Sequence, residues 1–206
     1  MVKTSSTMLP LGYAMPSFDL PLLQINDNTL FSSSNTAARF TSNMLLNKPV
    51  LIMILCAHCP FVKNIESELS KLDQDFGDDI QFLAVASNSV ESHPEDGPEF
   101  LVQQIIKNGW NFPYLLDLEQ TFAKSLKAAC TPDFFLFSYP NKGSHHLIYR
   151  GQLDESRPGN NIDPNGFDLR RALNAVLNSC EVPIDQKPSI GCNIKWREGF
   201  EPSWFG

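Results

Sequence analysis

The sequence predicts a mixed α/β fold in which helices surround a central sheet. Residues 50–55 form an unbroken apolar run, which is typical of a strand buried on both faces. Apolar residues then recur every three or four positions over 59–76, as they do on one face of a helix. Strand-like and helical segments continue to alternate, and a hairpin and a helix follow, so layers of helices on one sheet are expected.

The remaining elements follow from local pattern. Residues 18–20 and 29–31 flank the turn-forming residues 26–28 and predict a small N-terminal β-hairpin. Further strands are predicted at 80–86, 112–116, 134–137 and 147–149, and further helices from residue 100 onward, at 119–128 and at 167–177. Turn residues at 139–143 join the last two strands, which indicates an antiparallel pair.

A chain of 206 residues suits a single domain with a real core. We expect an N-terminal extension at 1–14, a core at 15–179 and a C-terminal tail at 180–206. Three of the aromatic residues in the tail are Trp196, Phe200 and Trp204, and burying them requires the tail to pack on the body.

Composition excludes several function classes. The net charge of −7 argues against a surface for nucleic acid or anionic membrane. No apolar run is long enough to span a bilayer, and the first residues lack the apolar stretch of a secretory signal. Five irregularly spaced cysteines do not indicate a disulfide framework, so a reducing, cytoplasmic location is expected. The oligomeric state is left open.

Two cysteines lie at the junction of the predicted central strand and the helix after it. Cys56 and Cys59 are separated by Ala57 and His58, and Pro60 suits the first turn of a helix. Unpaired backbone N–H groups at a helix N-terminus favour a thiolate over a thiol. We therefore predict a redox dithiol in which the pKa of Cys56 is lowered.

Two other interpretations of this pair stay open. Cys56 and Cys59 could form half of a zinc site completed by His58 or by one of the remaining cysteines, Cys130, Cys180 and Cys192. They could also be buried cysteines without a chemical role. Both are less favoured, because the chain has no second Cys-x-x-Cys pair and because this pair opens a helix with a histidine inside it.

Several motifs together resemble one superfamily. They are Met15-Pro-Ser-Phe-Asp-Leu-Pro21, Cys56-Ala-His-Cys-Pro-Phe-Val-Lys63, Pro94-Glu-Asp96, Cys130-Thr-Pro-Asp-Phe-Phe-Leu-Phe137, Tyr149-Arg-Gly151, Ser156-Arg-Pro-Gly-Asn160 and Lys187-Pro-Ser-Ile-Gly-Cys-Asn-Ile-Lys-Trp196. The chain resembles thioredoxin-fold proteins of the peroxiredoxin-like branch, related to alkyl hydroperoxide reductase and thiol-specific antioxidants. This resemblance implies a thioredoxin-like fold with a Cys-x-His-Cys site.

The resemblance also implies roles for individual residues. Pro132 should be a cis-proline facing the dithiol, with Thr131 beside the sulfurs and its backbone open to pairing by an extended partner chain. Cys56 would attack a partner disulfide and Cys59 would resolve the mixed disulfide. His58 would adjust the redox poise.

The other cysteines are less defined. Cys130 precedes Thr131, so its sulfur should lie near the dithiol, either as an additional redox thiol or as a filler of a small buried gap. Cys192 lies in the tail, and either an extra resolving thiol or a structural role fits it. Cys180 is expected to be incidental.

The expected function is a thiol–disulfide oxidoreductase in redox homeostasis or antioxidant defence. Its partners would be protein or small-molecule disulfides and thiols, and no cofactor, metal, nucleic acid or membrane is expected. A thiol peroxidase is the alternative, with Arg150 or Arg157 as the peroxide-binding arginine. The threonine that peroxiredoxins carry three residues before the reactive cysteine is missing, however, since Met53 or Cys56 stands there. A non-catalytic redox sensor is the third possibility.

Overall fold

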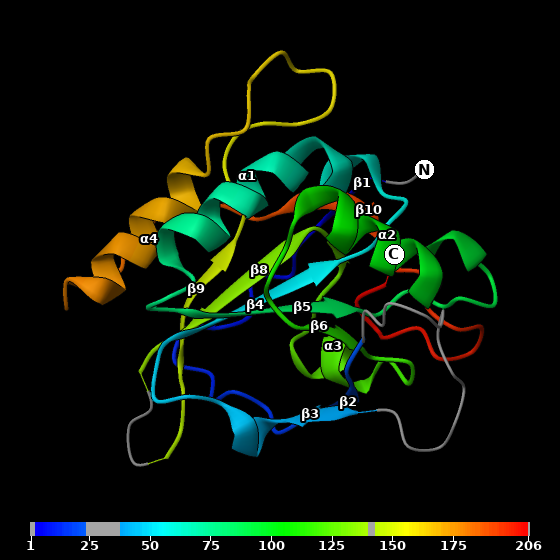
Figure 1. The fold of residues 1–206 in the computed structure, drawn as a ribbon, viewed down its shortest axis with the longest axis horizontal. Coiled ribbons are helices and arrows are strands. Elements are labelled where there is room, and N and C mark those ends of the chain that lie inside the picture. Colours follow the sequence, from blue (N-terminus) through cyan, green and yellow to red (C-terminus); the bar gives the residue numbers. More distant parts are fainter. Residues whose placement is uncertain (1–2, 24–37, 140–142, 206) are drawn as a thin grey trace.

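The computed structural model describes residues 3–23, 38–139 and 143–205. A five-stranded mixed sheet lies at its centre (Figure 1). In spatial order, its strands are β6 (Tyr114–Leu116), β5 (Gln81–Ala86), β4 (Val50–Leu55), β8 (Asp133–Phe137) and β9 (Leu147–Gly151). β4, β5 and β6 run parallel, whereas β8 is antiparallel to both β4 and β9. The predicted mixed α/β architecture is confirmed.

Helices cover both faces of this sheet (Figure 1). α1 (Pro60–Phe76), α2 (Pro98–Asn108) and α4 (Phe167–Leu177) pack on one face. α3 (Thr121–Ser125) packs on the other, together with the strand pair β2 (Asp19–Pro21) and β3 (Arg39–Thr41). The helices predicted at 59–76 and 167–177 are confirmed, and the one predicted at 119–128 is confirmed in a shorter form.

The side chains of β4 alternate between two hydrophobic cores. Leu51, Met53 and Leu55 lie in the core under α1, α2 and α4. The even-numbered residues of β4 lie in the second core with α3, β2 and β3. All six residues of β4 are buried, which explains why the sequence shows an unbroken apolar run without alternation.

The N-terminal strand pair differs in part from the prediction. β2 pairs antiparallel with β3, and Asp19 lies opposite Thr41. The second strand that we predicted, at 29–31, lies outside the described residues.

A second sheet forms where the two ends of the chain meet. β10 (Ile190–Asn193) lies between β1 (Lys3–Ser5) and β7 (Cys130–Thr131) and is antiparallel to both. The tail packs on the body as predicted, because Trp196 is buried and Trp204 Nε1 donates to the Ala128 carbonyl at 3.3 Å, but Phe200 is exposed and is not buried as expected. Two short 3-10 helices, Ser42–Met44 and Pro94–Asp96, complete the described elements.

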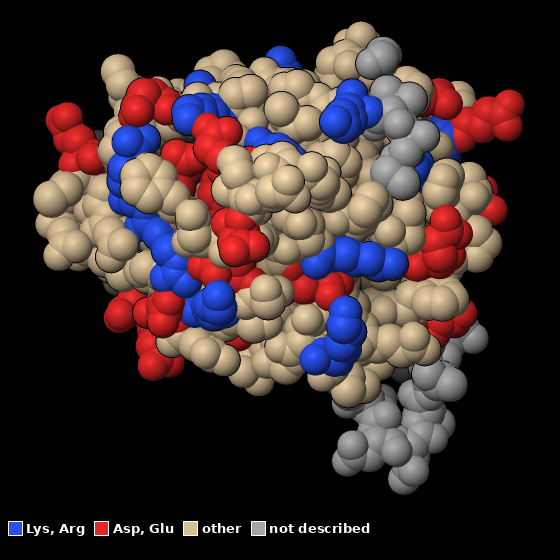
Figure 2. Space-filling view, turned by 90° about the horizontal axis from the view of Figure 1, so that it is seen from above, with Lys and Arg blue, Asp and Glu red and all other residues tan. Residues whose placement is uncertain are grey.

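Charges of both signs are mixed on the face that α1 and α4 cover. Figure 2 shows lysines and arginines interspersed with acidic residues there. Three ion pairs join α1 to α2 or α4, for example Arg170 Nη1 to Asp75 at 2.6 Å, and a fourth lies within α1. Among the described residues, no helix has both the length and the apolar character needed to cross a membrane.

Candidate active site

The start of α1 places the two cysteines of the motif differently. Cys56 directly follows β4, and Cys59 is the N-cap residue of α1, with extended backbone at ψ 123°. Pro60 takes the first helical position, where its missing N–H costs nothing. Only Cys59 therefore lies at the helix terminus, where backbone N–H groups and the macrodipole favour a negative charge.

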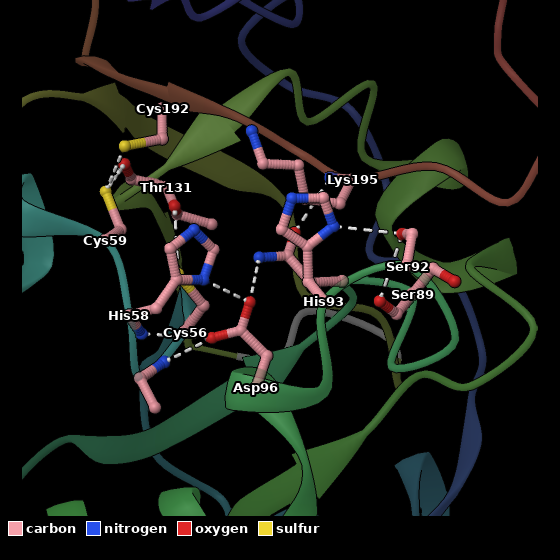
Figure 3. Close-up of polar contacts among 12 residues, drawn as sticks. Cys56, His58, Cys59, Ser89, Ser92, His93, Asp96, Thr131, Cys192 and Lys195 are labelled. Atoms are coloured by element: carbon pink, nitrogen blue, oxygen red, sulfur yellow. Dashed lines mark hydrogen bonds and ion pairs between the residues drawn. The ribbon is translucent and has the colours of Figure 1, made fainter. Parts of the chain in front are cut away.

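The sulfur of Cys59 is surrounded by polar partners (Figure 3). It lies 2.6 Å from the sulfur of Cys192 and 3.3 Å from the carbonyl oxygen of Thr131. Hydrogen bonding with Cys192, and then with Cys56, lowers the pKa of Cys59 well below its usual range, although burial opposes this shift. Cys59 is thus the most acidic of these thiols, because the pKa values of Cys56 and Cys192 are raised.

The lowered pKa that we predicted for Cys56 is wrong. Cys56 is fully buried, and this burial, followed by the hydrogen bond to Cys59, raises its pKa well above the usual range. The nearby negative charge of Asp96 acts in the same direction. The physical reason is position, because Cys56 lies one residue beyond a buried strand and three residues before the helix terminus that stabilises a thiolate.

Thr131 and Pro132 face the two cysteines. The Thr131–Pro132 peptide bond is cis, as the resemblance implied. The hydroxyl of Thr131 lies 3.4 Å from the sulfur of Cys56, and its carbonyl faces Cys59. Thr131 thus contacts both sulfurs of the motif, as expected from its place beside Pro132.

Asp96 organises the loop between the cysteines, and our sequence reasoning did not identify it as a site residue. Its carboxylate is 2% exposed and sits at the end of the 3-10 helix Pro94–Asp96. Oδ1 accepts hydrogen bonds from the backbone N–H groups of Ala57 and His58 at 2.9 and 3.0 Å. Oδ2 accepts one from the side-chain amide of Asn88 at 2.6 Å.

His58 is oriented by the same carboxylate. Its Nδ1 lies 2.6 Å from Oδ2 of Asp96, and its ring stacks on His93 with the centroids 5.5 Å apart (Figure 3). Burial, together with the positive charge of Lys195, lowers the pKa of His93. A histidine held through Nδ1 has its Nε2 available for proton exchange. His58 is therefore a fixed part of the site rather than a solvated loop residue.

A hydrogen-bonded brace supports the site from α2. Gln104 Nε2 donates to the carbonyl of Cys56 at 3.2 Å and to Glu66 at 3.0 Å. Lys107 pairs with the other oxygen of Glu66 at 2.9 Å, so this buried carboxylate is fully partnered. In the sequence, nothing distinguished Gln104 and Glu66 from other polar residues of the predicted helices.

The remaining predicted residues have other polar partners. The sulfur of Cys130 is buried and faces the carbonyl of Pro132 at 3.7 Å, whereas Cys180 is exposed at the end of α4. Arg150 binds the Leu9 carbonyl and Gln186, so its guanidinium serves the packing of the chain ends. Arg157 donates to Gln152 and to two nearby carbonyls.

One group of side chains has the composition of a metal site. Ligand atoms of Cys56, His58 and Asp96 lie within 4.8 Å of one another. Both oxygens of Asp96 already accept hydrogen bonds, and one of them holds Nδ1 of His58. The arrangement therefore fits a carboxylate that orients a histidine better than it fits an open set of ligands.

A dithiol at the start of a helix, facing a cis-proline on a mixed sheet, defines a redox protein of the thioredoxin-like fold. Residues 11–142 match the AhpC/TSA family. The chain belongs to this family, and this membership supports a redox function.

Solved structures agree with the fold. The chain is similar to an uncharacterized conserved protein from Geobacillus kaustophilus, with 39% identity, a TM-score of 0.84 and coverage of 96% of this chain and 98% of that one. A hypothetical protein from Sinorhizobium meliloti 1021 matches with 37% identity, a TM-score of 0.83 and coverage of 95% and 100%. A secreted disulfide oxidoreductase from Mycobacterium tuberculosis shares the fold alone, with 15% identity, a TM-score of 0.53 and coverage of 77% and 95%. No protein of curated function matches the chain.

Proposed function

We propose that this protein is a thiol–disulfide oxidoreductase that acts through the dithiol of Cys56 and Cys59, with Cys59 as the attacking thiolate. The observation that carries the proposal is the position of Cys59 at the N-cap of α1, where hydrogen bonding with other thiols lowers its pKa. We reverse the expected order of attack, because burial raises the pKa of Cys56. Thiolates, and not thiols, attack disulfides.

The reaction has two steps. The Cys59 thiolate attacks one sulfur of a substrate disulfide, a mixed disulfide forms, and the first substrate thiolate leaves. The thiol of Cys56, which is hydrogen-bonded to Cys59, then loses its proton and attacks the Cys59 sulfur. The second substrate thiol leaves, so the substrate gains two electrons and the protein holds a Cys56–Cys59 disulfide.

The pair formed by His58 and Asp96 supplies a route for protons. With Nδ1 held by Asp96, the ring can accept a proton at Nε2 from a reacting thiol and return it to a leaving thiolate. The buried carboxylate fixes the orientation of the ring, as the orienting acid does in other nucleophile–histidine–acid sites.

Turnover of a small disulfide tests the proposal. Purified protein is given oxidised glutathione as substrate and dithiothreitol as reductant, and the rate is compared among Cys59→Ser, Cys56→Ser and Cys180→Ser. We expect Cys59→Ser to show only the background rate and Cys180→Ser to match the wild type, since Cys180 is exposed and away from the site. Full activity in Cys59→Ser would refute the proposal.

A thiol peroxidase is the second candidate function. It is favoured by membership of the AhpC/TSA family and by a single low-pKa cysteine at the start of a helix. Arg150 and Arg157, the arginines considered for peroxide binding, are engaged by carbonyl and amide oxygens instead. Hydrogen peroxide as substrate separates the two activities, because a peroxidase with one essential thiol would retain turnover in Cys56→Ser.

A further inference from the structure

The C-terminal strand lies against the residue that faces both cysteines. β10 pairs antiparallel with β7, and Cys192 lies directly opposite Thr131. The backbone of Thr131 is the place where an extended partner chain would pair with this site. In this protein, β10 of the same chain pairs with Thr131 instead.

The contact between β10 and β7 depends on a glycine. A Cβ atom at Gly191 would overlap the carbonyl oxygen of Thr131 and crowd the nitrogen of Pro132. A side chain at this position would therefore push β10 away from β7. Gly191 is the residue that lets the strand approach so closely.

Further bonds hold β10 on both sides. On its other edge it pairs with β1, so that Lys3 lies opposite Cys192. Beyond its end, Lys195 donates its backbone N–H to Asn88, the residue that also donates to Asp96. The position of Cys192 is thus fixed by the fold and linked to the loop between the cysteines.

Cys192 also places its sulfur beside that of Cys59. Its sulfur lies 2.6 Å from that of Cys59, both residues are buried, and 133 positions of sequence separate them. The hydrogen bond with Cys192 is the largest influence that lowers the pKa of Cys59. By contrast, the sulfur of Cys130 on the paired strand faces the carbonyl of Pro132.

We infer that β10 acts as a built-in substrate strand, which occupies the pairing edge of Thr131 and presents Cys192 as the internal disulfide partner of Cys59. This inference rests on the proposed attack by Cys59 on a disulfide, replaces Cys56 by Cys192 as the thiol that resolves the mixed disulfide, and names the substrate class. While β10 stays in place, an extended polypeptide has no strand to pair with, so the disulfides that this protein reduces are small molecules.

A small disulfide is the oxidant that joins Cys59 to Cys192. The Cys59 thiolate attacks it and releases the first small thiolate. The thiol of Cys192 then loses its proton and attacks the Cys59 sulfur, the mixed disulfide breaks, and the second small thiol leaves. The small disulfide gains two electrons, and Cys59 and Cys192 become one disulfide that ties β10 to the start of α1.

Disulfide mapping tests this directly. Reduced protein is mixed with oxidised glutathione, stopped at graded times by acid, alkylated, digested and analysed by mass spectrometry. We expect a Cys59–Cys192 disulfide in the wild type, in Cys56→Ser and in the control Cys180→Ser. In Cys192→Ser we expect Cys59 to be joined to glutathione or to Cys56.

Gly191→Ala tests the role of the strand without changing a sulfur. Once circular dichroism shows that the variant is folded, formation of the Cys59–Cys192 disulfide should slow by about 10²-fold, the scale of a 1 Å misplacement of reacting atoms. Exchange with an extended peptide that contains a mixed disulfide should become faster. Ile190→Ala, at the partly exposed neighbouring position, should behave like the wild type.

The outcomes separate the two proposals. Only a Cys56–Cys59 disulfide in the wild type would overturn the role of Cys192 and leave the proposed function standing. Cys59 that does not react with glutathione at all would overturn both. If the wild type exchanges with the peptide as fast as Gly191→Ala does, the claim that β10 occupies the pairing edge of Thr131 is overturned. If Gly191→Ala fails to fold, the disulfide mapping still decides whether Cys192 is the partner of Cys59.

Discussion

Asp96 binds His58 twice. Its Oδ1 accepts the backbone N–H of His58 at 3.0 Å, and its Oδ2 lies 2.6 Å from Nδ1 of the ring. The same carboxylate also accepts the backbone N–H of Ala57 and the amide of Asn88. One buried acid thus fixes the loop between the cysteines, the orientation of the histidine and, through Asn88, the C-terminal segment.

Replacing this acid should loosen the site and destabilise the protein. Asp96→Ala leaves buried donors without an acceptor, and one such loss costs about 1–3 kcal/mol. We expect a decrease of at least about 2 kcal/mol in the free energy of unfolding, measured by urea denaturation. Glu95→Ala, at the exposed neighbouring position, is the control. An equal decrease in both variants would contradict this role of Asp96.

The elements with a local pattern were predictable. β4 and the helices α1 and α4 follow from apolar spacing within each segment, and the Cys56/Cys59 motif was visible because it lies at the junction of two such elements. The position of Cys59 as N-cap could have been read from Pro60, which marks the first helical residue.

The rest depends on contacts between distant segments. Residues 190–193 have no apolar period, and they form a strand only because β1 and β7 flank them. Asp96 lies in a polar connection, where an acid normally faces solvent, so nothing local indicated its burial. The pKa order of Cys56 and Cys59 also depends on Cys192, which the sequence places 133 positions away from Cys59.

The reactivity of Cys59 should persist at acidic pH. A thiol of the unfolded chain titrates near ~8.5, so its alkylation slows about tenfold per pH unit below that value. The pKa of Cys59 is lowered, first by the hydrogen bond with Cys192, so in the folded protein it stays a thiolate as the pH falls below ~8.5. We expect a flat rate of Cys59 alkylation between about pH 6 and 8 in the folded protein, followed by mass spectrometry.

The variant Cys192→Ala identifies the cause of this shift. Because it removes the largest influence on the pKa of Cys59, the alkylation profile of Cys59 should move toward higher pH. Cys180→Ala, which changes an exposed thiol, should leave the profile unchanged. If the alkylation rate of Cys59 depends on pH in the same way in the folded and the unfolded protein, Cys59 is an ordinary thiol.

The brace from α2 should contribute to stability. Gln104→Ala removes the donor shared by the Cys56 carbonyl and Glu66, and each unmet buried group costs about 1–3 kcal/mol. We expect the midpoint of urea denaturation to fall in Gln104→Ala and to stay constant in Gln103→Ala, because Gln103 is exposed on the same helix. A midpoint that is unchanged in both variants would show that water replaces the amide.

Asp133, the first residue of β8, should make stability depend on pH. It is buried, its Oδ2 has no hydrogen-bond partner among the described residues, and burial raises its pKa well above the usual range. An acid whose pKa is raised on folding contributes most to stability below the unfolded value of ~3.9, and this contribution is lost as the pH rises toward the folded pKa.

The isosteric variant Asp133→Asn tests this, because its side chain does not titrate. The stability of Asp133→Asn relative to the wild type should therefore increase with pH from about 4 upward, measured by urea denaturation across a pH series. The exposed Asp163→Asn is the matched control, and a constant difference between Asp133→Asn and the wild type at all pH values would mean that Asp133 is ionised in the folded protein as in the unfolded chain.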